Sequence, residues 1–150
     1  MNRGKNSFGQ IGQPYLRSSP SSTATPTAVA TDVGNWTMVS AGDTHSCGVA
    51  INGTGYCWGL GGSNFNVQSK LGNGMYGIWS TPTGVTFPTG VTAWVEIGAG
   101  YDFSCGRDSK GGVYCWGGSA ACRTVCCLCR HPLGATAWRC ICGTGTLSQH

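Results

Sequence analysis

Short stretches of alternating polar and apolar side chains, separated by glycine-rich turns, run through the middle of the chain. One stretch spans residues 36–41 and a second spans residues 94–99. Alternation with a period of two predicts β-strands that present one face to a core. The side chains expected to share a face are Thr37, Val39 and Ala41 in the first stretch, and Val95, Ile97 and Ala99 in the second.

Turn signals join these stretches to further strands. Residues 46–51 and 56–58 flank Asn52-Gly53, a strong hairpin turn, and Lys110-Gly-Gly112 takes the same place later in the chain. A fourth short strand is expected after each Thr-Pro pair, at residues 27–29 and 83–87. Three or four antiparallel strands of this size make one propeller blade.

The pattern repeats as a whole, because residues 36–59 return without a gap at residues 94–117. Tryptophans, glycines and cysteines recur at matching positions, and Gly9-Gln-Ile-Gly12 resembles Ser69-Lys-Leu-Gly72. Such a period is typical of repeat architectures, in which each unit covers the apolar face of its neighbour. With 26 Gly among 150 residues and no stretch of helical period, the predicted class is all-β.

The run Ala41-Gly-Asp-Thr-His-Ser-Cys-Gly-Val, followed by Gly55-Tyr-Cys-Trp-Gly, resembles the repeat of the regulator of chromosome condensation family. Asn6-Ser-Phe-Gly-Gln-Ile-Gly12 resembles a third element of that repeat. The cysteines make the chain similar to secreted and cell-surface members. The resemblance implies a seven-bladed propeller, and this chain, with about two units, would form an incomplete β-propeller.

The repeat divides the chain into four expected parts. Residues 1–29 would be the remnant of a preceding blade with a Ser/Thr/Pro-rich loop, and residues 30–87 a complete repeat. Residues 88–118 would be a partial second repeat. Residues 119–150 would be a disordered or irregular Cys-rich tail, which we interpret as sequence never selected as part of this fold.

The distribution of charge along the chain does not favour nucleic-acid binding. The net charge is +4, yet all five acidic residues lie within residues 32–117, a region with only three of the nine bases. Nucleic-acid binding needs clustered basic residues, so we expect no nucleic-acid partner. No apolar run is long enough for a transmembrane helix, and the first twenty residues lack the apolar stretch of a signal peptide.

Two cysteine pairs flank the hairpin turns at equal spacing, Cys47 with Cys57 and Cys105 with Cys115. Equal distance from the turn places the members of a pair opposite one another, within reach of a structural disulfide. Two reduced, buried thiols are the alternative. Disulfides favour an extracellular or cell-surface location, and the possible glycosylation sites Asn35 and Asn52 fit the same compartment.

Other residues that could carry chemistry are few. His45 with Asp43 suggests acid–base work, but no nucleophile recurs at a suitable spacing, and we interpret this His as structural. Trp58 and Trp116 are expected to pack within the blades. The tail holds weak candidates for a zinc site, and we expect no metal and no other cofactor. These candidates are Cys122, Cys126, Cys127, Cys129, His131, Cys140 and Cys142.

The function predicted first is a non-catalytic interaction module, in which loops such as residues 61–77 hold a protein or glycan partner. The resemblance also implies guanine-nucleotide exchange on a small GTPase as an alternative. An appended enzyme domain has no residue set to support it, so we expect no enzyme. A degraded gene product without a function of its own is the remaining alternative.

Overall fold

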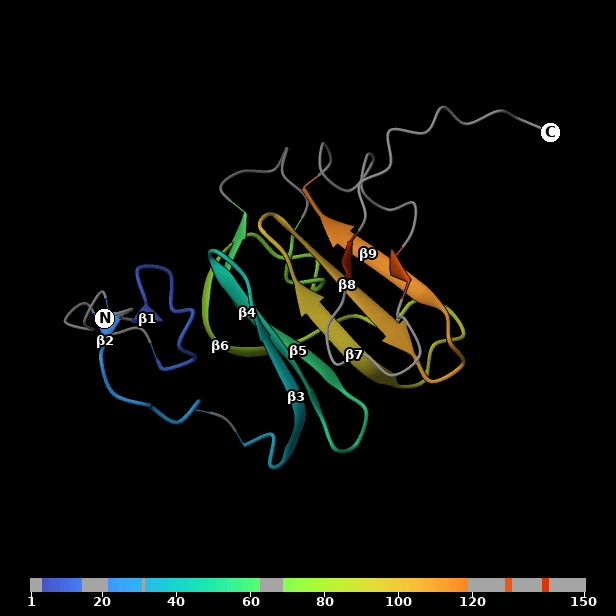
Figure 1. Ribbon diagram of the computed structural model, residues 1–150, viewed down its shortest axis with the longest axis horizontal. Coiled ribbons are helices and arrows are strands. Elements are labelled where there is room, and N and C mark those ends of the chain that lie inside the picture. Colours follow the sequence, from blue (N-terminus) through green and yellow to red (C-terminus); the bar gives the residue numbers. More distant parts are fainter. Residues whose placement is uncertain are drawn as a thin grey trace.

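The computed structural model describes residues 4–14, 22–30, 32–62 and 69–118, together with the backbone of two short strands in the tail. These residues contain strands and no helix. Two antiparallel sheets form the body of the molecule, and Figure 1 shows them side by side. This architecture is an incomplete β-propeller of about two blades, as predicted.

The first unit is a four-stranded sheet in the order β3-β4-β5-β6. Its strands are β3 (Trp36–Ala41), β4 (His45–Ala50), β5 (Gly55–Gly62) and β6 (Gly77–Gly84). The second unit is a three-stranded sheet in the order β7-β8-β9. Its strands are β7 (Trp94–Ala99), β8 (Phe103–Asp108) and β9 (Val113–Gly117).

Two small two-stranded sheets complete the described elements. Near the N-terminus, β1 (Gly4–Lys5) pairs with β2 (Ser22–Thr23), which lies in the segment expected to be a loop. In the tail, β10 (Cys129–Arg130) pairs with β11 (Arg139–Cys140). The rest of the tail lies outside the described residues.

The core lies between the two units, where β7 packs against β3 and β4. Gly55 makes this packing possible, because a Cβ atom there would overlap with Cδ1 of Ile97 and lie 2.8 Å from Cδ1 of Trp94. The buried core residues are Cys47, Val49, Cys57, Leu71, Val85, Val91, Trp94 and Ile97. Each unit therefore depends on its neighbour to cover its apolar face.

The predicted faces hold for β3 but not for β7. In β3, Thr37, Val39 and Ala41 share the exposed face. In β7, Val95 is 40% exposed and Ile97 is completely buried. The same register shift occurs in both strands, between Trp36 and Met38 and between Trp94 and Glu96. The difference comes from the neighbour, since the first unit covers Ile97 and no described unit covers its counterpart Val39.

The predicted fourth strand is displaced. It begins at Gly77, before the Thr-Pro pair, and ends at Gly84, while residues 27–29 form no strand. Pro82 lies inside this strand, and proline donates no hydrogen bond to a ladder. The strand shifts register between its pairs Cys57–Thr83 and Gly59–Trp79, and this irregularity accommodates the proline.

Candidate functional site

The two cysteine pairs sit on adjacent strands of their sheets. Cys47 pairs with Cys57 across β4 and β5, and Cys105 with Cys115 across β8 and β9. The Cα atoms are 4.0 Å apart in the first pair and 4.1 Å in the second, and both pairs have their sulfur atoms at disulfide distance. The first pair is completely buried in the core, whereas the second is partly exposed.

A buried hydrogen-bond chain links the two units. His45 is completely buried, and its Nε2 lies 2.8 Å from Oγ of Ser104 in β8. Ser104 donates its only proton to the backbone carbonyl of Lys70, 2.8 Å away. Nε2 of His45 must therefore carry a proton and donate it to the serine, which is the reverse of the proton flow in a nucleophile–base pair.

Burial keeps His45 neutral. Its pKa is lowered from 6.5 to about 4, first by burial and then by the Lys70 ammonium, while the Asp102 carboxylate raises it. Nδ1 has no hydrogen-bond partner among the described residues, and in the Nε2-protonated tautomer this atom is a bare acceptor. His45 thus acts as a structural donor between the units, in line with its interpretation as a structural residue.

Lys70 adds a second link across the interface between the two units, which we call the seam. Its Nζ donates to Oγ1 of Thr44 in the first unit at 2.8 Å and pairs with Oδ1 of Asp102 in the second unit at 2.9 Å. The lysine side chain is 6% exposed and the aspartate side chain 53%. A buried ammonium needs such partners because an unpaired charge there would be costly.

A loop docks on each unit through the same pair of hydrogen bonds. The backbone carbonyl of Lys70 accepts from Ser104 Oγ and, at 3.1 Å, from Trp116 Nε1. Near the N-terminus, the carbonyl of Gln10 accepts from Ser46 Oγ and Trp58 Nε1, both at 2.9 Å. Segment 9–12 therefore docks on the first unit as segment 69–72 docks on the second.

Sequence reasoning missed the partner of His45. It looked for a nucleophile near His45 or Asp43, whereas Ser104 lies in the next unit. The signal was present, because Ser46 and Ser104 occupy matching repeat positions. Asp43 is exposed, and its backbone carbonyl accepts from Nε2 of Gln10 at 3.4 Å.

The two tryptophans of interest pack within their blades. Trp58 is 3% exposed and lies 5.7 Å from Trp36 between ring centroids, and Trp116 lies 5.6 Å from Trp94. Trp116 is less buried than Trp58, because one side of its indole faces a pocket.

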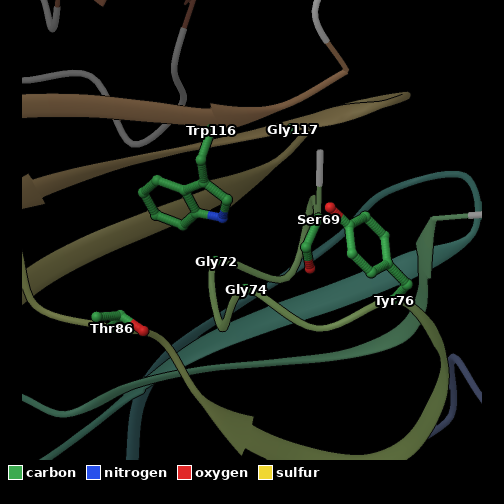
Figure 2. A pocket seen from close by; sticks show the side chains of 7 residues that line it. All are labelled: Ser69, Gly72, Gly74, Tyr76, Thr86, Trp116 and Gly117. Atoms are coloured by element: carbon green, nitrogen blue, oxygen red, sulfur yellow. The ribbon is translucent and has the colours of Figure 1, made fainter. Parts of the chain in front are cut away.

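This pocket has a volume of about 420 Å³ and lies beside β9. Figure 2 shows the indole of Trp116 at one side, the ring of Tyr76 at the other, and the loop through Gly72 and Gly74 between them. The residues that line it are Ser69, Gly72, Gly74, Tyr76, Thr86, Trp116 and Gly117. None is charged, so the pocket suits an uncharged, largely apolar group.

The remaining predicted sites lie at the surface or in the tail. Asn35 and Asn52 are exposed, and their glycosylation stays a prediction. Of the zinc candidates, the structure describes only the backbone of Cys129 and Cys140, which pair with each other. Cys122, Cys126, Cys127, His131 and Cys142 lie outside the described residues.

Metal clusters and membrane-spanning helices are both absent from the described residues. These residues contain no group of three or more His, Cys, Asp or Glu residues that could hold a metal ion. They also contain no helix with the length and apolar character needed to cross a bilayer.

One repeat family matches the chain in two places. Models of the regulator of chromosome condensation (RCC1) repeat match residues 3–49 and residues 94–120. No curated protein matches the chain over its sequence. The division into four parts expected from the repeat, and guanine-nucleotide exchange, stay predictions.

Solved structures share the fold. Human WBSCR16 superimposes with a TM-score of 0.63 at 22% identity, over 97% of this chain and 36% of that one. Yeast RCC1 (Prp20), solved bound to Kap60, gives a TM-score of 0.55 at 24% identity, over 77% of this chain and 27% of that one. This chain therefore spans about a third of the length of these structures. With both repeat matches and these neighbours, the chain is an RCC1-like repeat protein.

Proposed function

We propose that this chain is a non-catalytic protein-interaction module that forms part of a larger RCC1-like propeller protein. The observation that carries the proposal is a group of exposed apolar side chains where β6 begins. Met75 is 52% exposed, Tyr76 38% and Ile78 47%. Methionine and tyrosine are enriched at protein interfaces, and exposed apolar side chains gathered in one place mark recognition surfaces.

The buried side chains of the seam support the non-catalytic part of the proposal. The groups that could move protons, His45 and Ser104, are completely buried and engaged with each other and with a backbone carbonyl. A catalytic pair would need its reactive atoms to reach a substrate. These side chains hold the units together and leave recognition to the surface.

The larger propeller is inferred from the N-terminal segment. Segment 9–12 makes the contacts with the first unit that segment 69–72 makes with the second, although no described unit precedes it. We assign it to a preceding unit of the parent protein. Val39 is 64% exposed while Ile97, at the matching position, is buried against the first unit. A preceding unit would cover Val39 in the same way.

We further propose an extracellular or cell-surface location. Two cysteine pairs at disulfide distance and two exposed glycosylation sequons, at Asn35 and Asn52, support it. Alkylation of the protein unfolded in urea without reductant tests it, since unfolding exposes every free thiol and oxidised pairs leave these four cysteines unlabelled. Labelling of Cys47, Cys57, Cys105 and Cys115 would contradict it.

The interaction proposal is tested by a surface variant and a matched control. Met75→Ser/Ile78→Ser removes the apolar group, and Ile51→Ser/Val95→Ser removes equally exposed side chains elsewhere. The recovery of cross-linked partner proteins should fall at least tenfold with the first variant and stay unchanged with the second, relative to the unmodified chain. Equal recovery with both variants, or recovery of glycans without any protein, would contradict a protein partner at this surface.

A further inference from the structure

Among the described residues, the second unit has an open edge where the first unit has a strand. In the first unit, β6 pairs with β5. In the second unit, β9 takes the position of β5, and no strand among the described residues pairs with its outer edge. An open sheet edge presents unpaired backbone groups and is a template for another strand.

The backbone of β9 is oriented for such pairing. Cys115 lies opposite Cys105 with Cα atoms 4.1 Å apart, the spacing of a pair without backbone hydrogen bonds between its members. Because orientation alternates along a strand, the N–H and C=O groups of Val113, Cys115 and Gly117 point away from β8. The matching residues of β5 are Gly55, Cys57 and Gly59, and the carbonyl of Gly55 accepts from the N–H of Val85 next to β6.

The pocket beside β9 lies where β6 lies in the first unit. Its lining residues Gly72, Trp116 and Gly117 match Gly12, Trp58 and Gly59 of the first unit. There the space is filled, since Trp79 pairs with Gly59, and Ser80 lies so close to Gly9 that a Cβ on the glycine would be 2.6 Å from its own. Accordingly Trp58 is buried, while Trp116 is partly exposed.

From this correspondence we propose that the edge of β9 and the adjoining pocket bind an extended polypeptide strand that is antiparallel to β9 and resembles β6. Its aromatic residue lies opposite Gly117, as Trp79 lies opposite Gly59. Its next residue is glycine and enters the pocket between Trp116 and Ser69, because Ser69 carries a side chain where its counterpart Gly9 has none. A β-branched residue lies opposite Cys115, as Thr83 lies opposite Cys57. Main-chain pairing gives affinity and the pocket gives specificity.

This inference deepens the proposed function and rests on it, because it names the chemistry of one partner. The two proposals still fail separately. The strand site uses β9, Trp116 and Thr86 and shares only Tyr76 with the exposed apolar group, and the surface test above leaves Tyr76 unchanged. If strand binding fails while partners are still lost with that surface variant, the general interaction role stands without the strand site.

The test uses the full chain and a dye-labelled synthetic peptide with the sequence of residues 76–86 and the change Ser80→Gly. Fluorescence anisotropy should show saturable binding, and hydrogen exchange should slow at residues 113–117. A peptide with Ser80→Leu should bind at least tenfold more weakly because the pocket does not admit a large residue beside Ser69. No binding of the Ser80→Gly peptide, or equal binding of both peptides, would overturn the proposal.

Chain variants locate the site. Val113→Pro removes an outward N–H and should weaken binding at least tenfold, while Val113→Ala keeps that N–H and should bind as the unmodified chain does. Thr86→Trp fills the pocket from an exposed position and should abolish binding even where the proline variant folds poorly. Binding that survives both Val113→Pro and Thr86→Trp would show exchange with β6 of the first unit and would overturn the proposal. Dimerisation of the chain that Val113→Pro abolishes would do so too, by assigning the edge to a second copy.

Discussion

The two units carry the same strand motif in different surroundings. In the first unit His45, Ser40 and Val49 face the seam, and in the second unit Phe103, Gly98 and Arg107 stand at the matching positions. Two of these side chains form hydrogen bonds with the second unit. His45 bonds Ser104, and Oγ of Ser40 accepts from the N–H of Ala99 at 3.0 Å. The second unit cannot form the same links with a following unit.

Burial follows the same division. Every residue of β4 is buried, whereas β8 alternates between buried and partly exposed residues. The disulfide-spaced cysteines and the tryptophans are likewise less covered in the second unit. A repeat motif therefore specifies the shape of a unit, while the neighbouring unit decides how much stability each of its side chains contributes.

The tryptophans that begin β3 and β7 should show the largest difference in their contribution to the free energy of unfolding. Trp94 is 2% exposed between the units, and its counterpart Trp36 is only partly buried. Trp94→Ala should lower the free energy of unfolding by about 3–5 kcal/mol, because it removes a large buried side chain and leaves a cavity. Trp36→Ala should cost about half as much. Urea unfolding measures both, and equal losses would mean that the seam does not decide the contribution.

Removal of the cysteine pairs should give the second-largest difference in unfolding free energy between the units. Both pairs close loops of the same length, so each disulfide should contribute about 3 kcal/mol through the unfolded chain. Cys47→Ala/Cys57→Ala should cost about 1 kcal/mol more than Cys105→Ala/Cys115→Ala, because only the first pair is fully buried. Urea unfolding of both double variants, with and without reductant, compares them. A larger loss from the second pair would contradict the comparison.

His45 gives the first unit a pH dependence that Phe103 cannot give the second. The pKa of His45 is about 4 in the folded chain and 6.5 as the unperturbed value. Above pH 6.5 both states are neutral. As pH falls from 6.5 to 4, the unfolded chain binds a proton that the folded chain does not, so stability should fall by about 1.4 kcal/mol per pH unit.

The control for this prediction is His45→Gln, which keeps a side-chain donor for Ser104 but does not titrate. Urea unfolding at several pH values should show a loss of about 2–3 kcal/mol between pH 6.5 and 4 that is present in the unmodified chain and missing in the variant. Carboxylates titrate in both proteins and cancel in the difference. The same slope in both proteins would show that His45 is protonated in the folded state.

Much of this comparison could be predicted from the sequence, because glycines, tryptophans and cysteines report backbone geometry. The period predicted two sheets, and Asn52-Gly53 predicted the turn between β4 and β5. The burial of β7 and the start of β6 could not be predicted, since the first depends on cover from the neighbouring unit and the second on a register shift that no single residue marks. The His45–Ser104 bond could not be predicted either, because it joins units and needs their relative placement.

The smallest expected effect comes from the loop that enters each unit. In the second unit the buried Lys70 pairs with the carboxylate of Asp102, whereas in the first unit the amide of Gln10 donates to the backbone carbonyl of Asp43. Asp102→Asn should lower the free energy of unfolding by less than about 1 kcal/mol, because the Asp102 side chain is 53% exposed and solvent screens the pair. Asp43→Asn should cause no measurable change, since its side chain takes no part in the equivalent contact.

Salt separates the charge of this pair from its hydrogen bond. If the attraction between Lys70 and Asp102 contributes, the difference between the unmodified chain and Asp102→Asn should shrink as ionic strength rises, because screening acts on the exposed partner. Urea unfolding at low and high salt measures this difference. A difference that stays constant would assign the contribution of Asp102 to hydrogen bonding, and the two units would then differ at this loop in geometry rather than in charge.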